Sequence, residues 1–119
     1  MDNPLFSDLE IVENQYTQRD YEVKINIPEF NCVCPRTSLP DFATIKITYI
    51  PKNWIVELKS LKLYIVKFRN IGIFHENVTN KILDDFVRAA QPKSIVIEGA
   101  FKARGGIDTT VLCRWPDEK

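Results

Sequence analysis

Four stretches of the chain alternate apolar and polar residues, which is the pattern of strands with one buried face. They are Tyr21–Ile27, Ala43–Ile50, Ser94–Phe101 and Ile107–Trp115. Pro28 and Pro51 follow the first two stretches, where a proline interrupts the backbone hydrogen bonding of a strand. Gly105-Gly106 lies between the last two and is typical of a hairpin turn. The pattern therefore predicts two pairs of strands.

Between these pairs the apolar residues recur every three or four positions, as on one face of a helix. In the first such segment, Leu58–Phe68, the apolar face is made of Leu58, Leu61, Ile65 and Phe68. In the second segment, four-residue spacing relates Val78, Ile82, Phe86 and Ala90. Pro92 follows its end, as is common after a helix. We therefore predict two helices between the strand pairs.

The predicted order is strand, strand, helix, helix, strand, strand. Hairpins on either side of a helical pair can form one antiparallel sheet with both helices on a single face, so the predicted class is α+β. Such a sheet has two unpaired edge strands, and closure into a multi-subunit barrel would pair them. We therefore expect an oligomer with sites at subunit junctions. Residues 20–119 are the predicted domain, and the polar, aperiodic residues 1–19 are an arm expected to pack on a neighbour or stay loose.

Composition excludes several classes of partner. Sixteen basic residues balance 16 acidic ones, so the chain has no overall charge that would attract nucleic acid or an anionic membrane surface. No apolar run approaches the roughly 20 residues of a membrane span, and the first residues lack the basic flank of a signal peptide. The three cysteines are an odd number and are expected to be free thiols. We expect a cytoplasmic protein.

The segment Phe30–Ala43 has the composition of a reactive loop. It contains Cys34 and Asp41, and two prolines, one directly after the cysteine and one directly before the aspartate, restrict its backbone. Cys34 is the predicted nucleophile because a loop exposes a thiol more readily than the strand that contains Cys113. A carboxylate beside a thiol raises its pKa, so the expected role of Asp41 is proton transfer.

Two other groups of residues each allow a functional and a purely structural interpretation. Phe74-His75-Glu76 combines an aromatic ring, an imidazole and a carboxylate, which suit a flat nitrogen heterocycle but also suit the start of a helix. Lys59, Lys62 and Arg104 could bind phosphates or could simply be solvated. No glycine-rich motif of the Rossmann or P-loop type is present.

A zinc site is a further alternative for the cysteines. Cys32, Cys34, Cys113 and His75 could supply four ligands. The Cys-x-Cys spacing departs from the usual structural-zinc spacing, so no metal site is predicted.

These separate signals coincide with the motifs of one family. The run Glu57-Leu58-Lys59-Ser60-Leu61-Lys62-Leu63-Tyr64 matches the signature E-[S/L]-K-[S/A]-x-K-[L/Y]-[Y/F/W] of the NADPH-dependent 7-cyano-7-deazaguanine reductases, the nitrile reductases of queuosine biosynthesis. Four more segments stand in the family's order: Cys34-Pro35 through Pro40-Asp41-Phe42-Ala43, Phe68-Arg69-Asn70, Phe74-His75-Glu76 and Arg104-Gly105-Gly106. Over residues 20 to 107 the chain resembles the short, single-module branch of this family.

The resemblance implies a fold, an assembly and a reaction. The fold would be the tunnelling fold shared with GTP cyclohydrolase I, assembled as two pentameric rings. Cys34 would add to the nitrile carbon of 7-cyano-7-deazaguanine to form a covalent thioimide, with Asp41 as general acid and base. The implied substrate-binding residues are Glu57, Leu58, Phe74, His75 and Glu76. Lys59, Lys62 and Arg104 would hold the phosphates of NADPH, whose two hydride transfers would give 7-aminomethyl-7-deazaguanine.

Two positions depart from the family pattern. Leu58 replaces the more common serine, and Asn77 stands in the region where some relatives have a second cysteine that can bond the nucleophile. Cys32 is then the only sequence neighbour that could form a protective disulfide.

Two other classes of function remain possible from the sequence. Relatives that lack the nicotinamide signature use the same cysteine and aspartate for amidino transfer to a nitrile in tRNA, but the intact Glu57–Tyr64 motif argues against that activity here. A non-catalytic, oligomeric binding protein would need neither Cys34 nor Asp41.

Overall fold

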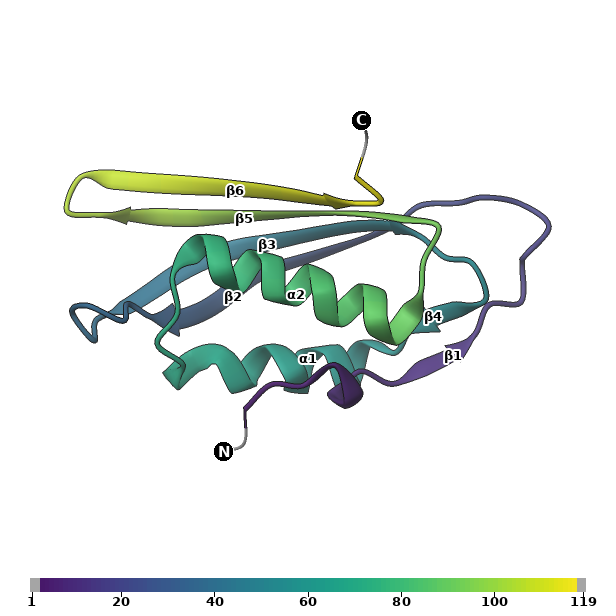
Figure 1. The fold of residues 1–119 in the computed structure, drawn as a ribbon, viewed down its shortest axis with the longest axis horizontal. Helices are drawn as coiled ribbons and strands as arrows, with labels where there is room; N and C mark the ends of the chain where they lie inside the picture. Colours follow the sequence, from purple (N-terminus) through teal and green to yellow (C-terminus); the bar gives the residue numbers. More distant parts are fainter. Residues whose placement is uncertain (1–2, 118–119) are drawn as a thin grey trace.

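A computed structural model describes residues 3–117 and consists of a sheet covered by two helices (Figure 1). The sheet contains β2 (Val23–Val33), β3 (Pro40–Ile50), β5 (Ser94–Arg104) and β6 (Ile107–Trp115). These strands are antiparallel and lie side by side in the order β2-β3-β5-β6. The helices α1 (Leu58–Val66) and α2 (His75–Ala90) lie on one face of the sheet. The predicted α+β class and order of elements are confirmed.

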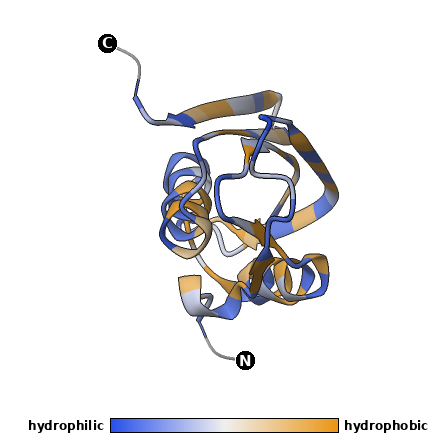
Figure 2. Ribbon diagram, turned by 90° about the vertical axis from the view of Figure 1, so that its right-hand side faces the viewer, coloured by the Kyte–Doolittle hydropathy of each residue, from blue (hydrophilic) through white to orange (hydrophobic). Residues whose placement is uncertain are grey.

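The core lies between the sheet and the helices. Every second residue is buried along β3 and along β5 as far as Phe101, including Ile45, Ile47 and Ile97. Figure 2 shows the sheet curving around the two helices when the molecule is viewed from its end. The first predicted helix ends earlier than Phe68, because residues Lys67–Asn70 form a tighter 3-10 turn, η2. No helix in the described part of the chain is long and apolar enough to cross a membrane.

Strand β2 is longer than predicted because it continues through Pro28. β2 is an edge strand, and its pairing with β3 shifts register between Ile27 and Phe30. A proline is tolerated both on an edge strand and at a bulge, so Pro28 does not end this strand. The bulge also changes which residues face the core, and it buries Phe30 and Cys32 completely.

The predicted reactive loop is consequently shorter than expected. Its first residues, Phe30–Val33, belong to β2, and its last residues, Pro40–Ala43, belong to β3. Only residues 34–39 connect the two strands. The proposed nucleophile and acid are therefore positioned by a paired hairpin and not by a long loop.

The described part of the N-terminal arm packs on its own chain and is therefore not loose, one of the two arrangements expected from the sequence. Its short strand β1 (Ile11–Glu13) pairs with β4 (Trp54–Val56). The backbone N–H of Glu10 donates to Ser60 Oγ over 2.9 Å, and the N–H of Glu57 donates to the carbonyl of Glu10 over 2.9 Å. The arm thereby holds the residues at which α1 begins.

Helix α2 approaches the sheet closely because β5 has a glycine at the point of contact. A Cβ atom on Gly99 would lie 2.7 Å from Thr79 Oγ1 and 3.2 Å from the Phe101 ring. The Thr79 hydroxyl cannot simply turn away, because it donates to the carbonyl of His75 over 2.8 Å. Gly99 therefore sets the distance between α2 and the sheet.

We predict that Gly99→Ala lowers the free energy of unfolding by about 1–3 kcal/mol, because the added methyl group overpacks this contact. Urea unfolding followed by circular dichroism measures the change. Gly72→Ala is the matched control, since a Cβ atom there would meet Pro35 at 3.6 Å, an ordinary contact distance. Equal unfolding free energies for the two variants would contradict the prediction.

Candidate active site

Cys34 lies directly after β2, in the turn that joins β2 to β3. Two backbone hydrogen bonds close this turn: Cys34 N–H donates to the carbonyl of Leu39 and Ser38 N–H donates to the carbonyl of Cys34, both over 2.9 Å. Ser38 has a positive φ of 62°, which reverses the chain. The thiol is partly exposed in this closed turn. Its position is therefore both fixed and accessible.

The three thiols differ strongly in their acidity. Hydrogen bonds from the Thr37 side chain, then from the backbone of Arg36 and Thr37, lower the pKa of Cys34 to about 7. Burial raises the pKa of Cys32 to about 12, and burial also raises the pKa of Cys113. The thiolate is the reactive form of cysteine, so Cys34 is the thiol best suited to act as a nucleophile near neutral pH.

Asp41 lies near the start of β3, and its carboxylate contacts the side chains of an arginine and a histidine. Its carboxylate is only 7% exposed. One oxygen contacts Arg104 Nη2 at 2.7 Å, and the other contacts His75 Nε2 at 3.1 Å. Arg104 comes from the end of β5 and His75 from the first turn of α2. Asp41 therefore joins three elements that are far apart in the sequence.

His75 is also fixed from two further directions. Its ring stacks on Phe101 with a centroid distance of 3.8 Å and an interplanar angle of 6°. Its Nδ1 atom lies 3.1 Å from Thr109 Oγ1. An ionised carboxylate can only accept, so Nε2 donates to Asp41, and neutral His75 then accepts from the Thr109 hydroxyl at Nδ1. The sequence analysis did not identify Phe101 or Thr109, although the Gly-Gly hairpin pairs these two residues across β5 and β6.

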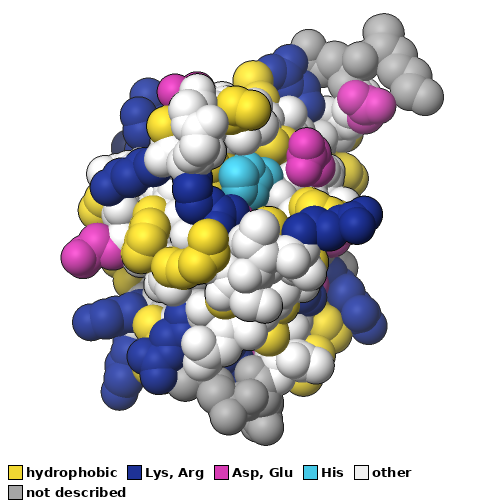
Figure 3. All heavy atoms as spheres, turned by 90° about the vertical axis from the view of Figure 1, so that its left-hand side faces the viewer, with side chains coloured by type: hydrophobic (Ala, Val, Ile, Leu, Met, Phe, Trp, Pro, Cys, Tyr) yellow, Lys and Arg dark blue, Asp and Glu magenta, His cyan; other side chains and the backbone are white. Residues whose placement is uncertain are grey.

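The other two residues of the Phe74-His75-Glu76 motif lie at the same end of the molecule. Phe74 is 44% exposed, and the Glu76 carboxylate has no hydrogen bond or salt bridge within residues 3–117. Figure 3 faces this end and shows the histidine at the surface with basic, acidic and apolar side chains around it. An exposed ring and a carboxylate without a partner are available to a ligand. One chain therefore brings Cys34, Asp41 and the Phe74-His75-Glu76 motif together.

A second group of predicted site residues lies at the start of α1. Glu57 caps this helix, because its carboxylate accepts from Lys59 N–H at 2.7 Å and from Ser60 N–H at 2.8 Å. These two hydrogen bonds lower the pKa of Glu57. Leu58 is 61% exposed. Lys59 and Lys62 are exposed and form no salt bridge within the described chain.

Within one chain, the group around Cys34 and Asp41 lies apart from the group at the start of α1. The turns that join β2 to β3 and β5 to β6 lie at the left-hand end of Figure 1, whereas α1 begins beside β4, toward the other end. Arg104, expected to bind cofactor phosphates with Lys59 and Lys62, lies with Asp41 instead.

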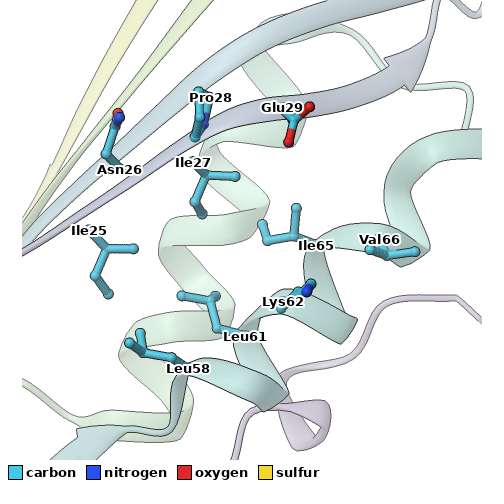
Figure 4. A pocket seen from close by; sticks show the side chains of 10 residues that line it. All are labelled: Ile25, Asn26, Ile27, Pro28, Glu29, Leu58, Leu61, Lys62, Ile65 and Val66. Carbon is cyan, nitrogen blue, oxygen red and sulfur yellow. The ribbon is translucent and has the colours of Figure 1, made fainter.

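A groove runs between helix α1 and the edge strand β2. Figure 4 shows Leu58, Leu61 and Ile65 of α1 facing Ile25 and Ile27 of the edge strand β2. Lys62 and Glu29 also line this groove. Leu58 and Lys62 of the family signature therefore border an apolar surface that another chain could reach.

The four candidate zinc ligands are not assembled in the structure. Within residues 3–117, no three His, Cys, Asp or Glu side chains lie close enough together to hold a metal ion.

Comparison with known proteins identifies the family. Residues 40–119 match the family model described as QueF-like protein. The NADPH-dependent 7-cyano-7-deazaguanine reductase of Chloroherpeton thalassium is 60% identical over 111 residues, which cover 93% of this chain and 96% of that relative. The enzyme of the same name from Thermomicrobium roseum is 54% identical over 108 residues, 91% of this chain and 84% of the relative. The chain belongs to the family of NADPH-dependent 7-cyano-7-deazaguanine reductases.

A solved structure supports the fold of this reductase family member. The apo form of the archaeosine synthase QueF-Like superposes with a TM-score of 0.76 and covers 82% of this chain and 96% of its own. Its sequence identity is 18%, so the likeness concerns the fold alone.

We predict that alkylation of this reductase family member by iodoacetamide rises with pH and reaches half its maximal rate near pH 7. The thiolate reacts, and its fraction grows as the pH passes the pKa of about 7 for Cys34. Mass spectrometry of peptides gives the rate for each cysteine. Cys32 should stay unmodified under these conditions, and a Cys34→Ala variant should show no titration near pH 7. A midpoint above pH 8.5 would contradict the prediction.

Proposed function

We propose that this chain reduces the nitrile of 7-cyano-7-deazaguanine to 7-aminomethyl-7-deazaguanine with NADPH. The observation that carries the proposal is the accessible Cys34, acidified by its turn, in a chain that is 60% identical to a protein named for this activity. The amidino-transfer alternative is not supported, because the relatives at 48–60% identity are all named as reductases.

In the proposed mechanism, the sulfur of Cys34 bonds to the nitrile carbon while Asp41 moves the proton. The proton leaves the thiol, passes through the Asp41 carboxylate and ends on the nitrile nitrogen, so that S–H adds across the triple bond to give a thioimide. A protonated thioimide accepts a hydride more readily than a free nitrile does. NADPH would supply two hydrides to this carbon. After the first, the C–S bond breaks, the Cys34 sulfur leaves as a thiolate and an imine remains; the second hydride gives the amine, and two protons taken up from water balance the two hydrides. Arg104 and His75 keep the Asp41 carboxylate aligned during the proton transfers.

We further propose that the complete site forms between two copies of the chain. One copy would provide Cys34, Asp41, Glu76 and their neighbours, and the other would provide Glu57, Leu58, Lys59 and Lys62 from the start of α1. Lys59 and Lys62 fit the phosphates of NADPH, since both are exposed and free of salt bridges in the described chain. Strands β2 and β6 form the two edges of the sheet, and apart from the pairing of Val33 with the segment around Gly72 they have no neighbouring strand within the described chain, in keeping with the expected pair of pentameric rings.

The reaction is tested by intact mass spectrometry after incubation with 7-cyano-7-deazaguanine in the absence of NADPH. We expect the protein mass to increase by the mass of the nitrile and to return to its original value when NADPH is added and consumed. Cys34→Ala should form no adduct and lose turnover while keeping its circular dichroism spectrum. An adduct that persists in the presence of NADPH would overturn the reductase proposal but leave Cys34 as the nucleophile.

Sharing of the site is tested by mixing two inactive variants, Cys34→Ala and Lys59→Ala, after dissociation and joint refolding. If each site takes Cys34 from one chain and Lys59 from another, random mixing leaves both residues intact in about a quarter of the sites. We therefore expect about a quarter of wild-type activity. No recovery in a mixture shown to contain mixed oligomers would contradict a shared site.

A further inference from the structure

The orientation of the His75 ring decides whether its Nε2 atom can donate to Asp41. Rotation of an imidazole by half a turn about the Cβ–Cγ bond keeps the ring in the same plane but exchanges each nitrogen with a carbon. Phe101 stacks on this ring with a centroid distance of 3.8 Å and an interplanar angle of 6°. Such a stack fixes the plane of the ring and is compatible with either orientation. The choice between them therefore depends on the groups at the edge of the ring.

Two oxygen atoms lie at this edge. Asp41 Oδ2 is 3.1 Å from Nε2, and Thr109 Oγ1 is 3.1 Å from Nδ1. In the rotated ring a carbon atom would face each oxygen, and both hydrogen bonds would be lost. Asp41 also contacts Arg104 at 2.7 Å, so its carboxylate keeps a cationic partner when the ring turns. Thr109 is therefore the second point that holds the ring in the orientation that serves Asp41.

The hairpin of β5 and β6 places this hydroxyl group. Thr109 pairs with Phe101 across the two strands, so both side chains point to the same face of the sheet, against which α2 packs. The next two residues of β6 on that face, Val111 and Cys113, are partly buried and apolar, whereas Thr109 brings a hydroxyl group. Its branched Cβ atom restricts the rotation of the side chain. The hydroxyl group therefore has a fixed place beside His75.

We propose that Thr109 is a positioning residue of the reaction, which holds the His75 ring in the orientation in which Nε2 donates to Asp41. A hydroxyl group can donate to Nδ1 or accept from it, so this contact persists whether or not Nδ1 carries a proton. Loss of the hydroxyl group leaves the ring held at one edge atom only, and the Asp41 carboxylate is then less well aligned. The consequence for proton transfer by Asp41 rests on the proposed function, but the hold on the ring does not.

The hold on the ring is tested by ¹⁵N NMR in alkaline buffer, because His75 is the only histidine of the chain and its ring nitrogens can be labelled alone. Magic-angle spinning of sedimented protein makes the measurement independent of oligomer size. Thr109→Val removes the hydroxyl group at nearly constant shape, and Thr109→Ser keeps it. Thr110→Val is the matched control, because Thr110 is exposed on the opposite face of β6.

We expect the Nδ1 resonance of Thr109→Val to move to higher frequency, toward that of an unprotonated nitrogen without a hydrogen bond. Thr109→Ser and Thr110→Val should match the wild type. An unchanged Nδ1 resonance in folded Thr109→Val would overturn the proposal, and Thr109→Ala provides a second hydroxyl-free variant if the valine protein does not fold. This measurement requires neither nitrile nor NADPH.

The role in the reaction is tested by the rate of adduct formation with 7-cyano-7-deazaguanine, with Thr109→Val made both in the wild type and in His75→Phe. Phenylalanine keeps a ring against Phe101 but has no nitrogen. If Thr109 acts through His75, its hydroxyl group accelerates adduct formation about fivefold in the wild type and has no effect in His75→Phe. Equal slowing in both backgrounds would indicate a purely structural role, and no slowing in the wild type would contradict any role. Absence of an adduct in the wild type itself would refute the proposed function and leave the NMR result standing.

Discussion

The buried carboxylate of Asp41 is the group on which the site depends. A carboxylate that is largely removed from water is unfavourable unless cations and hydrogen-bond donors surround it. Here the donors are Arg104 from β5 and His75 from α2, and neither element is near β3 in the sequence. Satisfying this one charge therefore ties together the start of β3, the end of β5 and the first turn of α2 at the site. The ring of His75 is fixed in turn by Phe101 and Thr109.

The two groups of candidate site residues lie apart within one chain. The helix that carries the lysines begins beside β4, far from the β2–β3 turn that contains Cys34 at the left-hand end of Figure 1. Glu57 uses both carboxylate oxygens to cap α1 within its own chain. Its first contribution is therefore to hold the start of the helix that carries Leu58, Lys59 and Lys62.

The sequence predicted the sheet and helices well because their apolar periods are strong, as with the four-residue spacing of Val78 to Ala90. The prediction was wrong where the local preference of a residue differs from what its tertiary surroundings allow. A proline normally signals the end of a strand, because it cannot donate a backbone hydrogen bond to the neighbouring strand. On an edge strand and at a bulge this hydrogen bond is not required, so β2 continues through Pro28. Strand β1 has three residues, too few to show a period, so the packing of the arm gave no signal. Cys34 and Asp41 were identified by residue type and resemblance, whereas the contacts of Phe101 and Thr109 with His75 join strands to a helix that is distant in the sequence, and no local pattern records them.

The interruption of β2 at Pro28 also bears on how the free chain avoids misassembly. A long, regular edge strand can pair with any other extended segment, and such pairing begins many aggregates. The bulge and the missing N–H of Pro28 interrupt the regular spacing of hydrogen-bonding groups along β2 between Ile27 and Phe30. An irregular edge of this kind is a poorer template for a continuous ladder with a stray strand.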